Sequence, residues 1–513
     1  MPSSERSAIA AGVLGSHECE ASTPAAGMRT CCSVLLAARA RGPRQHLATY
    51  TLTLSHDPVA QAAGDGCTAT CECETDPCRF TASPQVNLAS VVAGLVPGAT
   101  LTLAPGTYAG GGSCGWSIQA ASTPGNGSVS VVHERPITIR GSGQSASDVL
   151  IDCQAMGAVV DGAINGPTHL RLENMHFKSA QRSGVGGSLL RAERGALIVI
   201  DNCRVTDCGS DGEGGAILLS NSDLEIRGSH FEVLRAEVNG GALALVNGAR
   251  ALLIDSTFKD CSAGNFGGAA FVLSGSSCVM DGAVFAFNEA GAKGGGVFAG
   301  DNSHLNVSAT VFKNNTSIRG GAAMVQFGSS LRINRGSTFI GNENQAYGGI
   351  YLLADSFLEI DGSGGRIEFV ENHGWVAVHI NVYLRCHVIF RGDILFTGGW
   401  ARDQGVYIWD AIVEIFKDSH AGTRFQNNWA QLSSAGLCVA SPETVAVVEG
   451  IVSEDNNVRL GDEGYTRVAG EGGTGVWVWT MASLFLRNSI VRRNSVSPKS
   501  HPSSFLFHLS RLR

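Results

Sequence analysis

The sequence contains no run of 18 apolar residues, and only 16% of its 513 residues are Asp, Glu, Lys or Arg. A helix that crosses a bilayer needs about 20 mostly apolar residues, so no segment of this chain is predicted to span a membrane as a helix. The formal net charge of −8 lacks the basic excess that attracts nucleic acid or anionic lipid. These absences disfavour nucleic acids and membranes as partners.

Proline is sparse, with 14 residues, whereas glycine is abundant, with 66 residues, and 44% of the chain is apolar. Intrinsically disordered chains have too few apolar residues to form a core, and this chain does not have that composition. Short strands joined by tight turns are typical of such a mixture. The composition therefore predicts an all-β protein.

A unit of about 27 residues recurs along most of the chain. It contains a pair of glycines, apolar residues that alternate with polar ones, a phenylalanine, and an amide three positions after the phenylalanine. The glycine pairs begin at Gly186, Gly214, Gly240, Gly267, Gly294, Gly320 and Gly348. The phenylalanines at intervals of 27 are Phe231, Phe258, Phe285, Phe312 and Phe339. The amides are Asn288, Asn315, Asn342, Asn372, Asn428 and Asn494.

The phenylalanine series continues in both directions with small insertions. Its outer members are Phe177, Val205, Phe369, Phe396, Phe425, Val452 and Val491. The amide position has exceptions, which are Ala180, Cys208, Leu234, Cys261, Gly399 and Asp455. We expect about twelve to fourteen repeats in total.

The alternation of apolar and polar residues within each repeat excludes helical repeats. A propeller blade takes about 40 residues or more, so 27 residues fit one coil of a parallel β-helix. In such a coil, equivalent phenylalanines stack inside the bore and equivalent asparagines hydrogen-bond from coil to coil. The glycine pair supplies a corner that requires close approach or a positive φ.

The β-helix is expected to occupy residues 101–495, followed by a tail over residues 496–513. Residues 81–100 are expected to form an N-terminal cap, because Leu88, Val91, Val92 and Leu95 have helical spacing. Residues 1–80 are expected to be a disordered leader. Within that leader, Met28 to Ala40 is the better candidate for a signal sequence, and a wrongly assigned start is the alternative.

The fifteen cysteines divide into two groups. The first group crowds into residues 67–78, where two disulfides are favoured over zinc because no pair has the usual C-x2-C spacing. Its members are Cys67, Cys71, Cys73 and Cys78. The second group is scattered through the repeats and is expected to be buried as small apolar residues. It comprises Cys153, Cys203, Cys208, Cys261, Cys278, Cys386 and Cys438.

The two recurring motifs resemble those of the polymorphic outer membrane protein repeat, within the pectin-lyase-like superfamily of right-handed parallel β-helices. Its GGA[IL] motif occurs as GGAI from Gly214 and as GGAL from Gly240, and its F-x-x-N motif occurs from Phe285 and Phe312 onward. The resemblance covers residues 85–495. It implies a right-handed β-helix and a role in surface display and adhesion, while fold alone does not fix function.

The superfamily also includes lyases and hydrolases that act on polysaccharides in a groove along the outer face. The segments that mark the hydrolases (NTD, GHG and RIK) are absent from this sequence. Asp255 and Asp281 are predicted to be adjacent copies of one turn position, where two carboxylates could share a calcium ion. A solvated turn that favours aspartate is the alternative. We expect no other cofactor and no other metal.

The segment from Trp375 to Trp429 is the most irregular part of the repeats. Trp400 and Trp429 directly follow the amide position, so they are predicted to lie one above the other on neighbouring coils. Together with Trp375 and Tyr407 they could form a platform for a sugar ring, or they could fill space against the coils. The sequence thus predicts a non-catalytic extracellular or cell-surface scaffold that binds a glycan or a protein. A polysaccharide lyase or hydrolase is the alternative.

Overall fold

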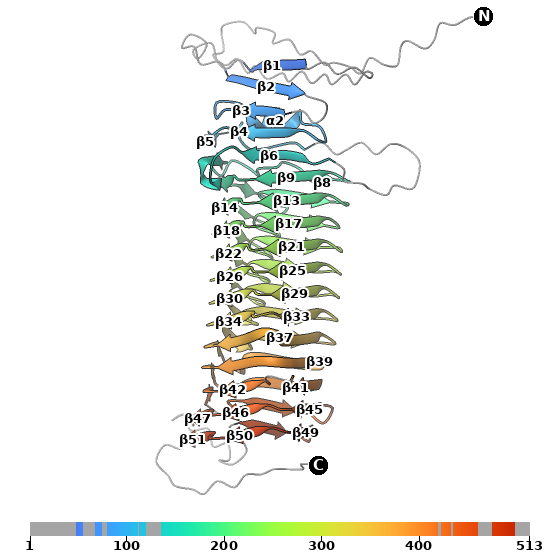
Figure 1. Ribbon diagram of the computed structural model, residues 1–513, viewed down its shortest axis with the longest axis vertical. Coiled ribbons are helices and arrows are strands. Elements are labelled where there is room, and N and C mark those ends of the chain that lie inside the picture. Colours follow the sequence, from blue (N-terminus) through green and yellow to red (C-terminus); the bar gives the residue numbers. More distant parts are fainter. Residues whose placement is uncertain are drawn as a thin grey trace, which may run out of the picture.

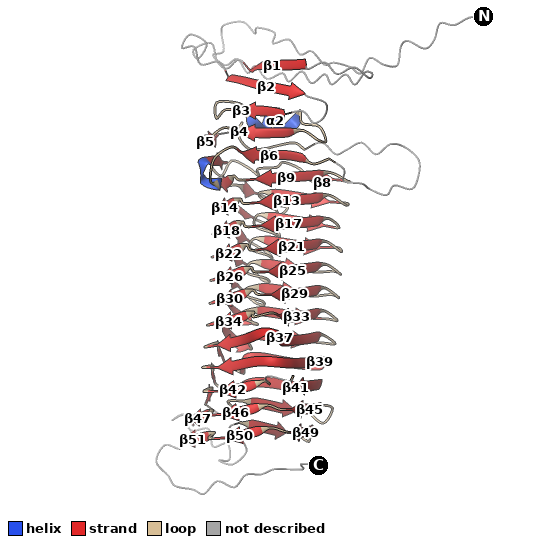
Figure 2. Ribbon diagram, viewed as in Figure 1, coloured by secondary structure: helices blue, strands red, loops and turns tan. Residues whose placement is uncertain are grey.

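The computed structural model describes residues 48–54, 67–73, 79–110, 112–118, 135–418, 422–431, 434–459 and 475–497. The chain winds into a rod of stacked coils, with the N-terminal coils at one end and the C-terminal coils at the other (Figure 1). Figure 2 shows that the rod consists almost entirely of strands. No helix among these residues is long and apolar enough to cross a membrane.

Each regular coil contains four strands, which we call first to fourth in chain order. In one coil these are β20 (Leu243–Val246), β21 (Arg250–Ile254), β22 (Thr257–Lys259) and β23 (Ser262–Ala263). Every strand pairs in parallel with its equivalent in the next coil, as Phe231 of β18 (His230–Glu232) does with Phe258 of β22. The fourth strands form a separate sheet of twelve. The predicted parallel β-solenoid with a period of about 27 residues is confirmed.

The other strands follow the same order. First strands are β8 (Ile164–Asn165), β12 (Leu190–Glu193), β16 (Ile217–Ser220), β24 (Ala270–Val272), β28 (Val297–Ala299), β32 (Ala323–Gln326), β36 (Ile350–Leu353), β44 (Leu437–Ala440) and β48 (Val476–Trp479). Second strands are β4 (Thr100–Leu103), β6 (Ile137–Gly141), β9 (His169–Glu173), β13 (Leu197–Asp201), β17 (Asp223–Arg227), β25 (Ser277–Asp281), β29 (His304–Ser308), β33 (Ser330–Asn334), β45 (Val445–Glu449) and β49 (Ser483–Arg487).

Third strands are β5 (Gly106–Ala109), β7 (Val149–Asp152), β10 (His176–Lys178), β14 (Arg204–Thr206), β26 (Val284–Ala286), β30 (Val311–Lys313), β34 (Thr338–Ile340), β42 (Arg424–Gln426), β46 (Val452–Glu454) and β50 (Ile490–Arg492). Fourth strands are β11 (Gln181–Arg182), β15 (Gly209–Ser210), β19 (Arg235–Ala236), β27 (Glu289–Ala290), β31 (Thr316–Arg319), β35 (Glu343–Tyr347), β38 (His373–Gly374), β40 (Trp400–Ala401), β43 (Trp429–Ala430), β47 (Asn457–Arg459) and β51 (Ser495–Ser497). Some strands merge, in β37 (Phe357–Val370), β39 (Ala377–Thr397) and β41 (Gln404–Phe416).

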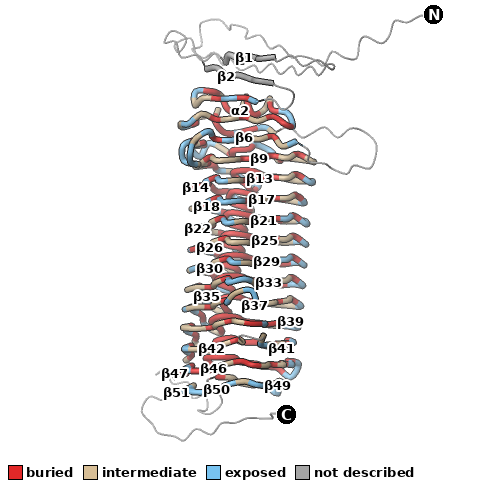
Figure 3. The backbone as a smooth tube through the Cα atoms, viewed as in Figure 1, coloured by how far each residue is buried: buried red, intermediate tan, exposed pale blue. Residues whose placement is uncertain are grey.

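The phenylalanines of the third strands form one stack inside the bore. Ring centroids of neighbours from Phe231 to Phe339 lie 5.0 to 5.1 Å apart, with interplanar angles of 15° or less. The stack continues through Phe369, Phe396 and Phe425. Figure 3 shows buried positions along the whole series of coils. Each buried ring stabilises the fold by about 1.5–3 kcal/mol through removal of apolar surface from water.

The predicted asparagine ladder lies beside this stack. The side-chain amide of Asn315 donates to Oδ1 of Asn342 at 2.9 Å and to the backbone oxygen of Phe285 at 2.9 Å. Asn288 and Asn342 donate in the same way to the next asparagine. Because these amides are buried, each hydrogen bond avoids the cost of an unsatisfied polar group.

Two assignments at the C-terminal end were wrong by one residue. The residue that pairs with Phe425 and Val491 is Ser453, not Val452. The residue in the ladder is Asn456, not Asp455, because Asn428 donates to Asn456 and Asn456 donates to Asn494. The polar pair Ser453 and Asn456 lies inside the coil, where the side chain of Asn456 also donates to the hydroxyl of Ser453 at 3.1 Å.

A histidine closes the gap in the ladder at Gly399. The side-chain amide of Asn372 lies 3.3 Å from Nδ1 of His379, and Nε2 of His379 lies 2.9 Å from Oδ1 of Asn428. A Cβ at Gly399 would lie 2.5 Å from Nε2, so glycine leaves the room that the imidazole occupies. Burial lowers the pKa of His379 to about 4. Neutral His379, with its proton on Nε2, thus replaces an asparagine.

The glycine pairs form the corners before the first strands, as predicted. Gly240 has a φ of +66°, and a Cβ there would lie 2.3 Å from the backbone oxygen of Leu243. A Cβ at Gly241 would lie 2.0 Å from the oxygen of Gly268 in the next coil. Only glycine fits both positions without movement of the backbone.

The N-terminal end carries the predicted short helix. Helix α2 (Leu88–Ala93) buries Leu88, Val91 and Val92 in the same hydrophobic cluster as the bore. It connects β3 (Arg79–Ala82) to β4, and these two strands pair in parallel. Two antiparallel strands, β1 (Ala48–Leu54) and β2 (Cys67–Cys73), lie in the segment expected to be a disordered leader. The proposed signal sequence at residues 28–40 lies outside the described residues.

The scattered cysteines are buried, with one correction. Cys153 was expected to be a small apolar residue but forms a disulfide with Cys114. The two Cα atoms lie 5.6 Å apart because parallel pairing of the first coils brings distant residues together. The six remaining cysteines of this group are free and buried, as predicted. Burial raises the pKa of the Cys203 thiol to about 12, which makes it a poor nucleophile.

Candidate functional site

Trp400 and Trp429 lie on adjacent fourth strands, β40 and β43, and are paired in register as predicted. Their side chains are 46% and 43% exposed, whereas the next residues, Ala401 and Ala430, are buried. Successive residues of a strand point to opposite faces, so the two tryptophans lie on the outside of the rod. They are not part of the core.

Trp375 extends this surface on the preceding coil. It is 53% exposed, and the guanidinium of Arg402 lies 4.6 Å from the centre of its indole ring. His373 pairs in register with Trp400. We call Trp375, Trp400, Trp429, His373 and Arg402 the tryptophan patch. The patch combines exposed indole faces with a cation, which is a combination suited to stacking and hydrogen bonding with a polar ring.

A second aromatic surface lies on the outer face of the first strands in the same part of the rod. Its rings contact one another from coil to coil. The centroids of Tyr383 and Trp409 are 6.0 Å apart, and those of Trp409 and Trp479 are 6.1 Å apart. We call the following set the aromatic face: Tyr347, Tyr351, Tyr383, Tyr407, Trp409, Trp477 and Trp479.

Tyr407 belongs to this face rather than to the tryptophan patch. It is only 3% exposed and packs in a small cluster with Ala377, Cys438 and Ala440, outside the bore. Burial and the neighbouring Tyr383 raise the pKa of Tyr407 far above its usual range. Burial likewise raises the pKa of Tyr351 to about 12. Both phenols therefore remain neutral and act as packing groups and hydrogen-bond donors at neutral pH.

An unsatisfied amide lies within the aromatic face. Asn381 pairs in register with Tyr351 on one side and with Tyr407 on the other, and it is fully buried. Neither its side-chain nitrogen nor its side-chain oxygen has a hydrogen-bond partner among the described residues. An unpaired buried amide costs about 1–3 kcal/mol. Such a group is a donor and an acceptor that is available to a hydroxyl group.

The register excludes the predicted calcium pair. Asp281 pairs with Ile254, so Asp255 is one residue past the equivalent position. Asp255 has a φ of +47°, and its carboxylate lies above Gly282. The turn that adds this residue was not recognised in the sequence. Within the described ranges, no group of three or more His, Cys, Asp and Glu residues could hold a metal ion.

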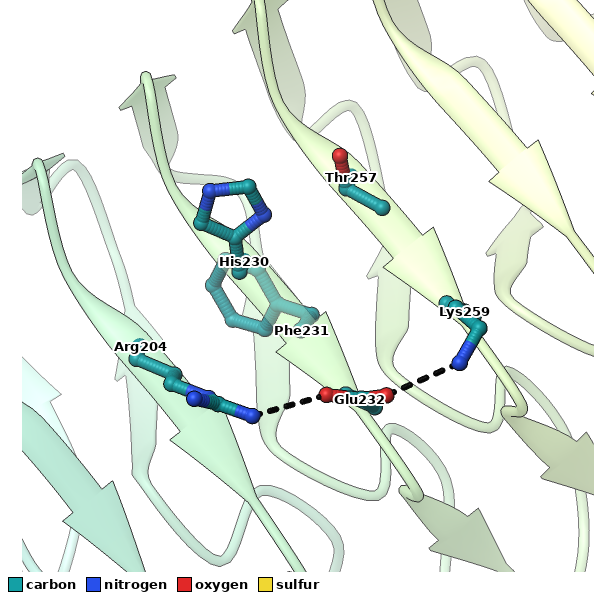
Figure 4. A pocket seen from close by; sticks show the side chains of 6 residues that line it. All are labelled: Arg204, His230, Phe231, Glu232, Thr257 and Lys259. Carbon is teal, nitrogen blue, oxygen red and sulfur yellow. Dashed lines mark hydrogen bonds and ion pairs between the residues drawn. The ribbon is translucent and has the colours of Figure 1, made fainter.

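The shallow depression in Figure 4 has no groups free for catalysis. It has a volume of about 290 Å³ and lies on β14, β18 and β22. Glu232 accepts from Arg204 at 3.0 Å and from Lys259 at 2.9 Å. Its pKa is lowered, chiefly by the hydrogen bond from Lys259. These charges neutralise one another across three coils, which is a structural role.

The four predicted disulfide cysteines cannot be assessed. Cys67, Cys71 and Cys73 lie in β2, whose side chains are outside the described part of the chain, and Cys78 lies outside the described residues altogether. Their pairing stays a prediction.

Residues 137–364 match the family described as "Right handed beta helix region". The fold is a right-handed parallel β-helix. The predicted resemblance to the wider superfamily is confirmed at this level, and the closer resemblance of the β-helix to polymorphic outer membrane protein repeats stays a prediction. No curated protein sequence matches the chain.

Solved structures that resemble this β-helix do so weakly. A periplasmic alginate epimerase, AlgG, has a TM-score of 0.32 and 11% identity over 80% of this chain and 85% of its own. An alginate lyase from Paenibacillus sp. has a TM-score of 0.22 and 13% identity over 62% and 99%. The A-module of the mannuronan C-5 epimerase AlgE6 from Azotobacter vinelandii has a TM-score of 0.24 and 14% identity over 78% and 91%. These values carry no argument about what this β-helix binds.

Sequence reasoning found the tryptophan patch but missed most of the aromatic face. Trp477 and Trp479 are two residues apart in a VWVW strand, and Tyr407 and Trp409 have the same spacing in β41. Alternation with apolar residues was the available signal, because it places both aromatic side chains of each pair on the outer face.

Proposed function

We propose that this protein is a non-catalytic β-helix that binds a glycan on the outer faces of its C-terminal coils. One observation carries the proposal. Six of the seven tryptophans belong to the tryptophan patch or the aromatic face, outside the hydrophobic bore, and lie within residues 375–479. The bore does not need these rings, and exposed clusters of aromatic side chains mark binding surfaces.

The extracellular or cell-surface location is part of this proposal. The disulfide between Cys114 and Cys153 supports it, because disulfides persist mainly in oxidising compartments. The resemblance of the repeats to those of polymorphic outer membrane proteins also favours surface display and adhesion. A surface protein is the other class of partner that exposed tryptophans suit.

A glycan array followed by calorimetry tests the proposal. The double variants Trp400→Ala/Trp429→Ala and Trp409→Ala/Trp479→Ala should each weaken binding of the best glycan by about tenfold or more, as loss of an aromatic anchor does. Phe287→Ala is the matched control, because this phenylalanine is 47% exposed elsewhere on the rod. Equal binding by all variants would remove glycan binding from both surfaces.

The same proteins separate binding from catalysis. Incubation with polyuronates and neutral glycans, with and without calcium, should produce neither unsaturated nor reducing ends. Sustained production of either product would establish a lyase or a hydrolase in place of the proposed scaffold.

A further inference from the structure

A row of aromatic and basic side chains occupies the corner between the fourth strand of one coil and the first strand of the next. Phe266, Lys293 and Arg319 are equivalent positions on consecutive coils, joined by parallel bridges. Tyr347 follows on the next coil, where its oxygen accepts from the amide of Gly320. The period of the fold therefore places two cations one above the other, between two aromatic rings.

Both cations lie over rings. Nζ of Lys293 is 5.3 Å from the ring centre of Phe266, and the guanidinium carbon of Arg319 is 5.4 Å from that of Tyr347. Lys293 also donates to Oε1 of Gln326 at 3.0 Å, which directs the ammonium toward the outer face of the first strands. These contacts hold both positive charges in fixed places.

Neither cation has a carboxylate partner among the described residues. Other basic side chains on the rod do, such as Arg250 with Asp223 and Arg385 with Asp355. Burial, together with the charge of Arg319, lowers the pKa of Lys293. Two like charges that face each other without a counter-charge favour a bound anion.

This corner is continuous with the aromatic face. Tyr347 stacks on Tyr351 with ring centres 5.2 Å apart, and it meets Tyr383 edge-on at 6.4 Å. From Tyr383 the contacts continue through Trp409 to Trp479. A chain molecule that lies along the aromatic face and extends toward the N-terminal coils would therefore meet Arg319 and then Lys293.

We propose that Lys293 and Arg319 bind an acidic group of the glycan that lies on the aromatic face, either a carboxylate or a sulfate ester. This inference rests on the proposed glycan binding and adds the charge of the ligand. Arg319 offers a planar fork of N–H donors and Lys293 offers a point charge, so the two together accommodate an anion with several acceptor oxygens. The site is cationic at its N-terminal end and uncharged along the aromatic rings.

The test compares three oligosaccharides of equal length: a neutral glucan, a uronate oligomer and a sulfated galactan. Calorimetry with the wild-type chain at low and at moderate salt should show tighter binding of an acidic oligomer, and this preference should weaken as salt screens the charges. Lys293→Gln/Arg319→Gln should reduce the affinity for the acidic oligomer at least tenfold, to the level of the neutral one. Affinity for the neutral oligomer should not change.

Lys313→Gln/Arg335→Gln is the matched control, because both side chains are exposed and the change in net charge is the same. An equal loss in this control would show that overall charge, not this site, attracts the ligand, and would overturn the inference. Neutral binding without any preference for acidic oligomers would overturn the inference and leave the proposed function standing. No binding of any of the three would overturn both. The uronate and sulfate arms identify which acidic group is bound.

Discussion

The middle coils and the last coils of the rod use the same inward columns but differ in their outward faces. From Phe231 to Phe339 the period is constant, and the ladder from Asn288 to Asn372 is unbroken. From residue 375 onward the ladder is interrupted at Gly399 and tryptophans appear outside the bore. Regularity is therefore a property of packing, whereas the departures from it gather where we propose binding.

The interruption shows how a coil tolerates a change in the ladder. His379 reaches the ladder from the first strand part of β39 and satisfies Asn372 and Asn428 together. The amide network is preserved, but its stability becomes sensitive to pH at this coil. The same coil carries Trp400. The two regions can be separated experimentally by changes that affect one and spare the other.

The largest expected effect is a truncation in the middle stack. Phe312 is buried between the rings of Phe285 and Phe339, each 5.0 Å away. Phe312→Ala should reduce the free energy of unfolding by about 3–5 kcal/mol, because it removes a buried ring and leaves a cavity. Chemical unfolding measures the loss. Phe287→Ala, an exposed ring, is the control and should change stability by less than about 0.5 kcal/mol.

Acid should weaken the last coils more than the middle ones. His379 has a folded pKa of about 4, below its ordinary value of 6.5, so the unfolded chain binds the proton more readily. Its contribution is complete above pH 6.5 and is lost as the pH falls from 6.5 toward 4. Because one pKa unit corresponds to about 1.4 kcal/mol, the loss is of the order of a few kcal/mol.

The matched variant is His379→Ala/Gly399→Asn, which restores an asparagine to the ladder. Gly399 does not have a positive φ, so its backbone accepts a side chain once the imidazole is absent. Denaturant midpoints between pH 4 and 8 should show less acid sensitivity in this variant. A residual slope is expected from His176, whose pKa burial also lowers to about 4. An unchanged pH profile would contradict the role given to His379.

Much of the fold could be predicted because the inward columns repeat. A phenylalanine every 27 residues and an amide three residues later leave few other architectures, and the stack and ladder follow directly. Prediction failed where a strand begins or ends one residue later than in its neighbours. Val452 was chosen over Ser453 because an apolar residue was expected in the bore, but the register selects the serine.

The site was only partly predictable because outward positions do not repeat. Trp400 and Trp429 could be placed by their distance from the ladder, and both lie where expected. Asp255 and Asp281 could not, because a residue with positive φ shifts the register between their coils. The pairing of Cys114 with Cys153 joins irregular segments of the first coils, which lack the period that would align them.

A moderate effect is expected from the ladder itself. Asn342→Ala removes the acceptor for the side chain of Asn315 and the donor to Asn372. Stability should fall by about 1–3 kcal/mol, because buried polar groups lose their partners. Chemical unfolding compares this variant with Asn334→Ala, which loses only an exposed contact with Asn306. Equal stability of the two variants would mean that the ladder adds nothing beyond packing.

The smallest expected effect on stability is the most informative one for function. Trp400→Ala/Trp429→Ala should change the free energy of unfolding by no more than about 0.5 kcal/mol for each tryptophan, because both side chains lie outside the bore. Tyr407→Ala is the opposite control, since this ring is buried and its loss should destabilise the last coils. Thermal unfolding of the three proteins measures the contrast. A large loss of stability in the tryptophan variant would show that the patch is packing surface, and its exposed rings would then need no ligand to explain them.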